Sequence, residues 1–208
     1  MAKKNQMQCR QLECDGFPRA DHPVWKEADS CSLVDVVTGE KPFLGTQFSV
    51  FRCDKEQRIF FLFQGEDDRI QSSFRWRDEP LYREDVFEVF IADNNNVSHY
   101  IELEASPHNV LFDGLISCDE DGNRHLDMSF DIKEWRVETR YVEKKNYITS
   151  VWSLPYTAFS IPPEAGKSWR INAFRIDHSE RGESLQAWQK TGEANFHVPD
   201  AFGYLEFV

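Results

Sequence analysis

The chain has 208 residues, of which 40% are hydrophobic and 14% aromatic, so it can bury a sizeable core. Its formal net charge of −12 at pH 7 repels nucleic acids and anionic membrane surfaces, which excludes both as expected partners. No apolar run approaches the ~20 residues that a membrane-spanning helix needs.

The first residues are polar and follow no periodic pattern. Residues 1–14 are therefore predicted to form a polar N-terminal arm or an addition to a sheet edge, ahead of one domain over 15–208. The charged start has no apolar segment behind it, unlike a secretory signal. Five cysteines without a repeating spacing favour reduced thiols over a disulfide framework. Together these features predict a cytoplasmic location. The cysteines are Cys9, Cys14, Cys31, Cys53 and Cys118.

Short β-type runs separated by turn residues dominate the rest of the chain. The polar loops 93–96 and 119–123 and the break at 162–166 separate several of these runs. A single helical turn is expected at 156–160, before a double proline. This pattern predicts an all-β fold, an antiparallel β-sandwich of the jelly-roll type. The expected strands are 46–53, 58–65, 85–93, 99–106, 109–117, 126–132, 135–142, 147–154, 168–177 and 202–208.

The run 85–91 is apolar on both faces, which predicts a central strand that is covered on both sides. Glu88 lies in this run between Val86 and Phe90, and a buried carboxylate needs a partner. Either Glu88 accepts hydrogen bonds from sugar hydroxyls at one face of the sandwich, or it forms an internal ion pair with Arg170 or Arg175.

Two loops combine aromatic and polar side chains. Trp76 and Tyr82 lie in the segment 74–82, where their rings either plug an end of the sandwich or offer a stacking platform for a pyranose. Asn195, Phe196 and His197 lie in a second loop, just before the last strand. A ring, an amide and an imidazole in one loop favour a ligand site.

Catalytic motifs are missing from the sequence: it has no Gly-x-Ser-x-Gly, no phosphate-binding glycine loop and no His-Glu-x-x-His. Glu102 and Glu104 fall on one face of a predicted strand. Their ordinary interpretation is a solvated face, and the alternative is a glycosidase pair together with Glu88. The sequence therefore favours a protein without catalytic activity.

The blocks in their order resemble the carbohydrate-binding module family 9. The block 81–91, Leu-Tyr-Arg-Glu-Asp-Val-Phe-Glu-Val-Phe-Ile, is similar to an aromatic-x-x-Asp-x-x-Glu-hydrophobic-Phe-Ile segment of that family. Segments 100–107, 109–113, 152–159, 169–175 and 196–205 continue the resemblance, which spans about 15–208. The resemblance is closest to the stand-alone bacterial proteins of this type.

This resemblance implies a β-sandwich that clamps a sugar between two aromatic rings, without catalysis. By position, the rings are Tyr82 and Phe196, where the best-known members have tryptophans, and the acid is Glu88. His197, Asn195 and Trp76 complete the expected ligand-binding set. The expected partner is a neutral mono- or oligosaccharide, and the sequence does not determine the oligomeric state.

The resemblance also implies two alternatives concerning bound groups. No cofactor is predicted, although some members hold calcium, and the loops 93–96 and 119–123 offer suitable oxygen ligands. Related sandwiches in redox proteins bind haem through a Met paired with a His or Lys. Met128 is the one methionine in the domain that could serve this purpose.

Overall fold

The computed structural model describes residues 5–119, 121 and 123–208, and these form fourteen strands and five short 3-10 turns. None of the described residues form a helix that is long and apolar enough to cross a membrane. The strands are β1 Gln6–Gln11, β2 Asp29–Ser32, β3 Val34–Asp35, β4 Thr46–Cys53, β5 Arg58–Glu66, β6 Val86–Ala92, β7 His99–Ala105, β8 Leu111–Cys118, β9 Arg124–Asp127, β10 Arg136–Val142, β11 Tyr147–Pro155, β12 Ser168–Ser179, β13 Gly182–Ala187 and β14 Gly203–Phe207. The turns are η1 Pro23–Lys26, η2 Leu81–Arg83, η3 Glu143–Lys145, η4 Tyr156–Ala158 and η5 Pro199–Ala201.

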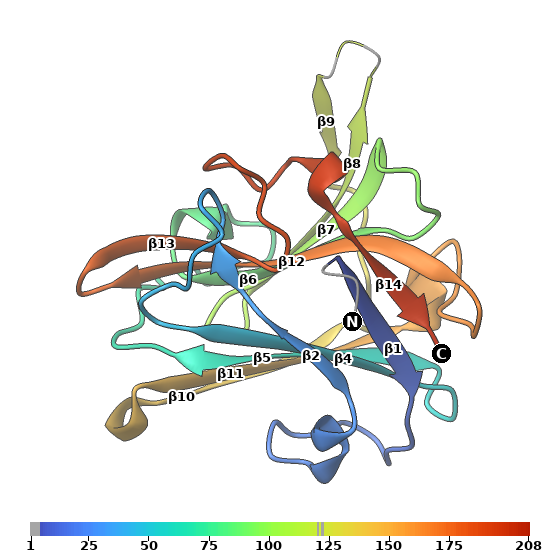
Figure 1. Ribbon diagram of the computed structural model, residues 1–208, viewed down its shortest axis with the longest axis horizontal. Helices are drawn as coiled ribbons and strands as arrows, with labels where there is room; N and C mark the ends of the chain where they lie inside the picture. Colours follow the sequence, from blue (N-terminus) through green and yellow to red (C-terminus); the bar gives the residue numbers. More distant parts are fainter. Residues whose placement is uncertain (1–4, 120, 122) are drawn as a thin grey trace.

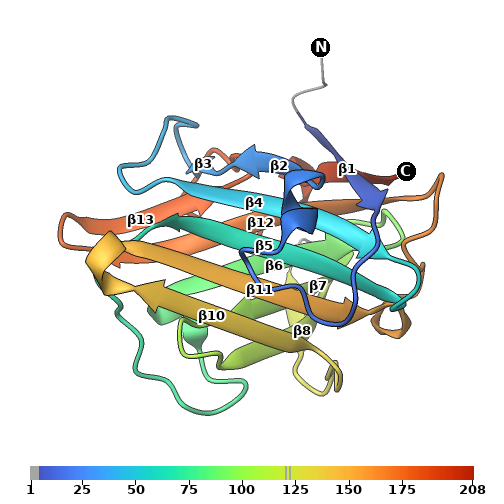
Figure 2. The ribbon, with the colours of Figure 1, turned by 90° about the horizontal axis from the view of Figure 1, so that it is seen from below.

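The strands stack in two layers, which Figures 1 and 2 show from two directions. One layer has the order β10-β11-β5-β4, with β2 beside β4, and the other has the order β14-β12-β6-β7-β8-β9, with β13 beside β12. Neighbours within each layer are antiparallel. The prediction of an antiparallel β-sandwich is therefore confirmed.

The main core lies between the two layers and is rich in aromatic rings. Phe63 of β5 stacks on Phe87 of β6, with 4.8 Å between the ring centroids. Val89 and Ile91 point into the same core as Phe87, whereas Val86 and Phe90 belong to a second apolar cluster on the outer face of their layer. All seven residues of β6 are buried, as the sequence predicts for a strand that is covered on both sides.

Strand β1 joins the two layers, and its pairings are parallel. It pairs with β14 on one side, where Gln6 lies opposite Tyr204, and with β4 on the other, where Arg10 lies opposite Phe51. The sequence analysis predicted an arm or an edge addition over 1–14, and β1 is added to the edges of both layers rather than forming a loose arm. Met7 and Cys9 alternate into the core and are 2% and 0% exposed.

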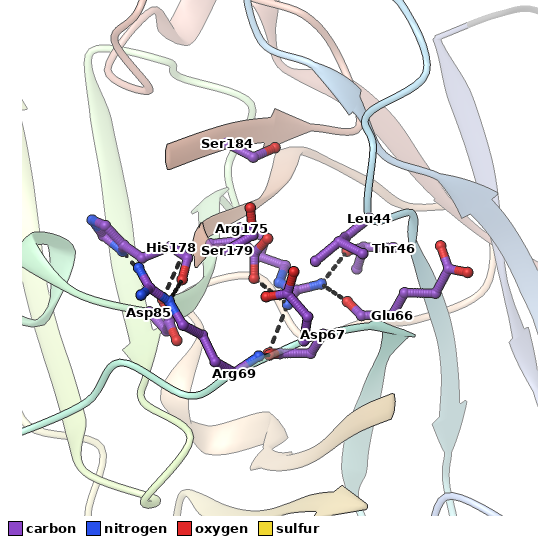
Figure 3. A network of polar contacts seen from close by, with 12 residues as sticks. Leu44, Thr46, Glu66, Asp67, Arg69, Asp85, Arg175, His178, Ser179 and Ser184 are labelled. Atoms are coloured by element: carbon purple, nitrogen blue, oxygen red, sulfur yellow. Dashed lines mark hydrogen bonds and ion pairs between the residues drawn. The ribbon is translucent and has the colours of Figure 1, made fainter. Parts of the chain in front are cut away.

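A buried polar network also ties the layers together (Figure 3). The Arg175 guanidinium on β12 donates to the Asp67 carboxylate at 2.9 Å, to the Asp177 carboxylate at 2.6 Å and to the Glu66 carbonyl at 2.8 Å. It also donates to the Thr46 hydroxyl of β4 at 3.0 Å. The Arg175 side chain of β12 thus contacts the ends of β4 and β5, which belong to the other layer.

Candidate functional site

A cavity of about 850 Å³ opens on the outer face of the layer that contains β6. That face is opposite the main core, because Glu88 alternates with the core residues Phe87 and Val89 along β6. Strands β6 to β9, β12 and β13 contribute to the walls, together with the segments around 80 and 196. The cavity is lined by Asp78, Pro80, Tyr82, Glu88, Glu102, Glu104, Phe112, Ile116, Asn123, Arg124, Leu126, Met128, Ile176, Leu185, Ala194, Asn195, Phe196 and His197.

Three carboxyl groups form a cluster on this face. Glu88 of β6 lies opposite Glu104 of β7 in the strand register, and Glu102 lies two residues earlier on the same face of β7. One oxygen from each group lies within 4.8 Å of those of the other two. The three residues are 2%, 6% and 1% exposed for Glu88, Glu102 and Glu104.

Burial and mutual repulsion favour the protonated forms of these groups. Burial, and then the neighbouring carboxyls, raise the pKa values of Glu88 and Glu104 well above the usual range. Burial also raises the pKa of Glu102, to about 7, while a hydrogen bond with Glu104 and then the positive charge of Arg124 oppose this rise. Because the three groups interact strongly, they titrate as a unit, and near neutral pH they share protons.

The structure corrects two interpretations of these glutamates. The prediction that Glu102 and Glu104 form a solvated strand face is wrong, because segments 78–82 and 194–197 pack over this part of β7. Glu88 does not form an ion pair with either candidate arginine. Arg175 is engaged by Asp67 and Asp177, and Arg170 donates to the carbonyls of Phe202 and Asp200.

Of the three aromatic candidates, two line the cavity. Tyr82 lies on η2 with 52% of its surface exposed, and Phe196 is 8% exposed. Phe174 of β12 supports Phe196 from below, with ring centroids 4.3 Å apart and planes 15° apart. Trp76 is 75% exposed and is not among the cavity residues, since a carboxylate oxygen of Glu79 accepts its backbone N–H and turns the loop there.

Asn195 and His197 line the cavity from the last loop. The Asn195 side-chain oxygen accepts the backbone N–H of His197 at 3.0 Å, which fixes the turn between them. His197 Nδ1 lies 2.8 Å from the Tyr100 hydroxyl, and its Nε2 lies 3.7 Å from Glu102. Burial and the positive charge of Arg124 lower the pKa of His197 to about 4, so the imidazole is neutral at physiological pH and does not form an ion pair with Glu102.

Sequence reasoning missed several cavity residues. Arg124 was not singled out, and it lies on the short strand β9. The apolar walls at Phe112, Ile116 and Leu126 were also missed. One signal in the sequence was the alternation of Glu102 and Glu104 with apolar residues. Glutamates on a strand that is paired on both sides indicate a polar site on that face of the sheet.

In each of the two candidate calcium loops an aspartate already accepts hydrogen bonds from protein groups. Asp93 accepts the backbone N–H and the hydroxyl of Ser160, and Asp119 accepts the backbone N–H groups of Asp121 and Asn123. Residues 120 and 122 lie outside the described part of the chain. Calcium at either loop stays an alternative to the prediction that no cofactor is bound.

Together, the two-layered sheet and its open cavity of aromatic and polar side chains define a β-sandwich with the form of a binding module. A family model described as "Carbohydrate family 9 binding domain-like" matches residues 18–208. The chain belongs to this family, which confirms the resemblance found in the sequence.

Solved structures of the same fold include known sugar complexes. A "putative carbohydrate-binding protein" from Bacteroides uniformis superimposes with a TM-score of 0.77 at 15% identity, covering 98% of this chain and 99% of that one. A carbohydrate-binding module of family 9 from Caldicellulosiruptor kristjanssonii, in complex with cellotriose, has a TM-score of 0.68 at 11% identity, covering 97% and 93%. At these identities the similarity establishes the fold.

A curated relative bears on the predicted location. A protein of Arthroderma benhamiae named "Extracellular protein" is 26% identical over 187 residues, covering 83% of this chain and 82% of the relative. This finding contradicts the predicted cytoplasmic location, which is wrong. That prediction relied on unpaired cysteines and on the start of the sequence.

Proposed function

We propose that the protein is a non-catalytic binding module for a mono- or oligosaccharide, which it holds in the cavity over β6 and β7. One observation carries the proposal: Tyr82, Glu88 and the segment 195–197, which are far apart in the sequence, line the same cavity. In the proposed complex a sugar ring lies against Tyr82 and Phe196, and Glu88 and Asn195 bind its hydroxyls, while His197 lines the cavity beside them.

The chemistry of the walls supports this arrangement. A pyranose has a face of C–H groups that an aromatic ring covers well, and Tyr82 is a half-exposed ring that such a face can reach. The carboxyl cluster offers oxygens that accept from hydroxyls, and its protonated members also donate. A volume of about 850 Å³ is within the ~300–1,000 Å³ range of small-molecule pockets.

A glycan-cleaving enzyme is the second candidate, and the raised pKa of Glu88 beside two further carboxyls favours it. Retaining glycosidases hold their two carboxyls ~5–5.5 Å apart and inverting ones ~6.5–9.5 Å apart, across the scissile bond. Here the three carboxyls lie side by side on the adjacent strands β6 and β7 rather than on either side of a bound sugar, which favours binding over cleavage. Hydrolysis of aryl glycosides that is abolished by Glu88→Gln would replace the binding proposal with this one.

Haem does not fit the cavity residues. Met128 and His197 both line it, but the two ring nitrogens of His197 already face protein groups. Nδ1 contacts the Tyr100 hydroxyl, and Nε2 faces the carboxylate of Glu102. An axial ligand would have to give up one of these positions to bind iron.

Calorimetric titration with glucose, cello-oligosaccharides and xylo-oligosaccharides tests the proposal. We expect saturable binding of at least one of these sugars, and Tyr82→Ala should weaken it about tenfold, since losing one stacked ring costs about 1–1.5 kcal/mol. Trp76→Ala is the matched control, because it removes an exposed ring outside the cavity and should leave the affinity unchanged. Absence of heat with every sugar would refute the proposal.

A further inference from the structure

The carboxyl cluster lacks the donors that its burial demands. Glu88 Oε1 and Glu104 Oε2 are buried and have no hydrogen-bond partner among the described residues. Both side chains are more than nine-tenths buried, and both line the cavity. A buried acceptor without a donor is unfavourable, and more so when it is charged. These oxygens therefore favour a ligand that brings hydrogen-bond donors.

The same cluster lacks a matching positive charge. Arg175 and Arg170 are committed elsewhere, and Arg124 acts on the Glu102 side, where it lowers the pKa of that group. The other titratable groups of the cavity are Asp78, Tyr82 and His197, and His197 is neutral above a pH of about 4. None of them supplies a cation to Glu88 and Glu104. A positively charged donor is consequently the ligand group that the cluster would bind best.

The spacing of the cluster suits a protonated amine. An ammonium group has three N–H donors in tetrahedral directions, and acceptors at about 2.8 Å from the nitrogen lie about 4.6 Å from one another. The upper limit of 4.8 Å among the three carboxylate oxygens accommodates this geometry. Calcium requires 6–8 oxygens at about 2.3–2.6 Å, whereas here apolar side chains such as Phe112 and Ile176 line the adjacent wall.

The rest of the cavity is suited to an organic skeleton attached to that amine. Tyr82 and Phe196 present aromatic surface, and Leu126 adds aliphatic surface. We propose that the cavity selects sugars with a protonated amino group, such as glucosamine units, over their neutral counterparts, with the amine held by Glu88, Glu102 and Glu104. This inference rests on the proposed function and replaces the neutral sugar expected from the sequence as the preferred ligand.

Besides tighter binding, an amine should cause a measurable release of protons, because the carboxyl cluster holds protons when no ligand is bound. A cation between the three carboxyls favours their ionised forms, so the protein releases protons as the amino sugar binds. A neutral sugar leaves the charge of the cluster nearly unchanged. Proton release therefore reports the contact between the amine and the carboxyls directly.

Calorimetry at pH 6.5, in two buffers of different ionisation enthalpy, tests the inference with glucose, N-acetylglucosamine and glucosamine as probes. We expect glucosamine to bind at least tenfold more tightly than the other two sugars, with a buffer-dependent heat that reveals proton release. Glu104→Gln should reduce this preference to less than threefold. Glu143→Gln, which changes an exposed carboxyl on η3, should leave the preference intact.

The outcomes separate the inference from the proposed function. Binding of glucose that equals or exceeds that of glucosamine would reject the inference and leave carbohydrate binding in place. Titration with Ca²⁺ is a further check. Binding of Ca²⁺ that abolishes the binding of glucosamine would also reject the inference, because the cluster would then be a metal site. Absence of binding by all three sugars and by the oligosaccharides would reject the proposed function as well.

Discussion

Glu102 is a residue whose pKa connects the cavity to the stability of the fold. Burial raises its pKa to about 7 in the folded state, above the ordinary value of a glutamate in an unfolded chain. A carboxyl with a raised pKa stabilises the folded state fully at acidic pH. This contribution is lost as the pH rises through about 7, where the folded protein must ionise a buried group.

Glu102→Gln should therefore remove the free-energy cost of ionising this buried carboxyl, a cost that increases with pH. Between pH 4 and pH 8 the variant should gain about 3 kcal/mol of unfolding free energy relative to the unaltered protein, since one pKa unit corresponds to 1.36 kcal/mol. Urea denaturation at several pH values measures the gain. Glu143→Gln, which changes an exposed carboxyl, should show no such trend, and a flat difference for Glu102→Gln would contradict the assigned protonation.

At the residue scale, most of the candidate residues lie together on one cavity, and their role in binding stays a prediction. The cavity is lined by Tyr82, Phe196 and Glu88, which the family resemblance indicated by position, and by Asn195 and His197, which the composition of their loop indicated. Burial of Glu102 and Glu104 was not predictable, because it depends on loops that arrive from distant parts of the chain. An alternating strand looks the same whether loops or water cover its polar face.

Among the elements, the loop before η2 is the one that positions Tyr82. Arg77 anchors it to β8 of the same layer, because its guanidinium donates to the buried carboxylate of Asp113 on β8 and lies 2.7 Å from Asp131. The backbone N–H of Asp78 also donates to the carbonyl of Leu111 at 3.0 Å. The cavity wall around residue 80 is thus tied to β8 by one side chain and one backbone bond.

Arg77→Ala should loosen this wall. It leaves the Asp113 carboxylate, which is 0% exposed, with the backbone N–H of Ile132 as its remaining described donor, so we expect a loss of about 1–3 kcal/mol in unfolding free energy. Sugar affinity should fall as well, because Tyr82 is no longer held in place. Chemical denaturation and calorimetry measure the two effects.

The control for this anchor is Arg75→Ala, which removes an exposed arginine whose side chain donates only within its own loop. It should change neither stability nor affinity by more than about 0.5 kcal/mol. Equal effects of the two variants would show that the Asp113 contact does not position the loop.

Strand prediction succeeded where apolar alternation and explicit turns coincide. The runs 46–53 and 135–142 correspond closely to β4 and β10, and the turn expected at 156–160 appears as η4. Strands β1, β2, β3 and β13 were missed, because they are short or rich in polar residues and exist through their partners in the sheet. The run 126–132 was placed too late, since Asp127 accepts from Ser129 and ends β9 there.

For the molecule as a whole, the Arg175 network fixes how the two layers sit on each other (Figure 3). Its two acidic partners, Asp67 and Asp177, are each about 1% exposed in their side chains. Burial raises the pKa of Asp67 to about 7, although Arg175 opposes this rise. Removing the arginine would leave two buried carboxyls without their cation.

Arg175→Met should therefore destabilise the fold in a pH-dependent way. At pH 8 we expect a loss of about 3–5 kcal/mol, the usual cost of breaking one side of a buried ion pair. The loss should shrink towards pH 4, where the aspartates take up protons and no longer need a counter-charge. Arg140→Met, at the exposed pair with Glu138 on β10, should cost less than about 1 kcal/mol at any pH.

The parallel pairing of β1 with β14 and β4 affects how the chain folds. The Gln6 side chain donates to Glu206 at 2.9 Å across a separation of 200 residues, so this pairing is among the most non-local contacts of the protein. Such contacts form late and slow the folding of β-rich proteins. Until β14 has been synthesised, the edge of β1 that pairs with β14 stays unpaired. Unpaired strand edges tend to pair with strands of other chains. We expect truncation before Gly203 to cause aggregation, although every residue of the cavity would still be present.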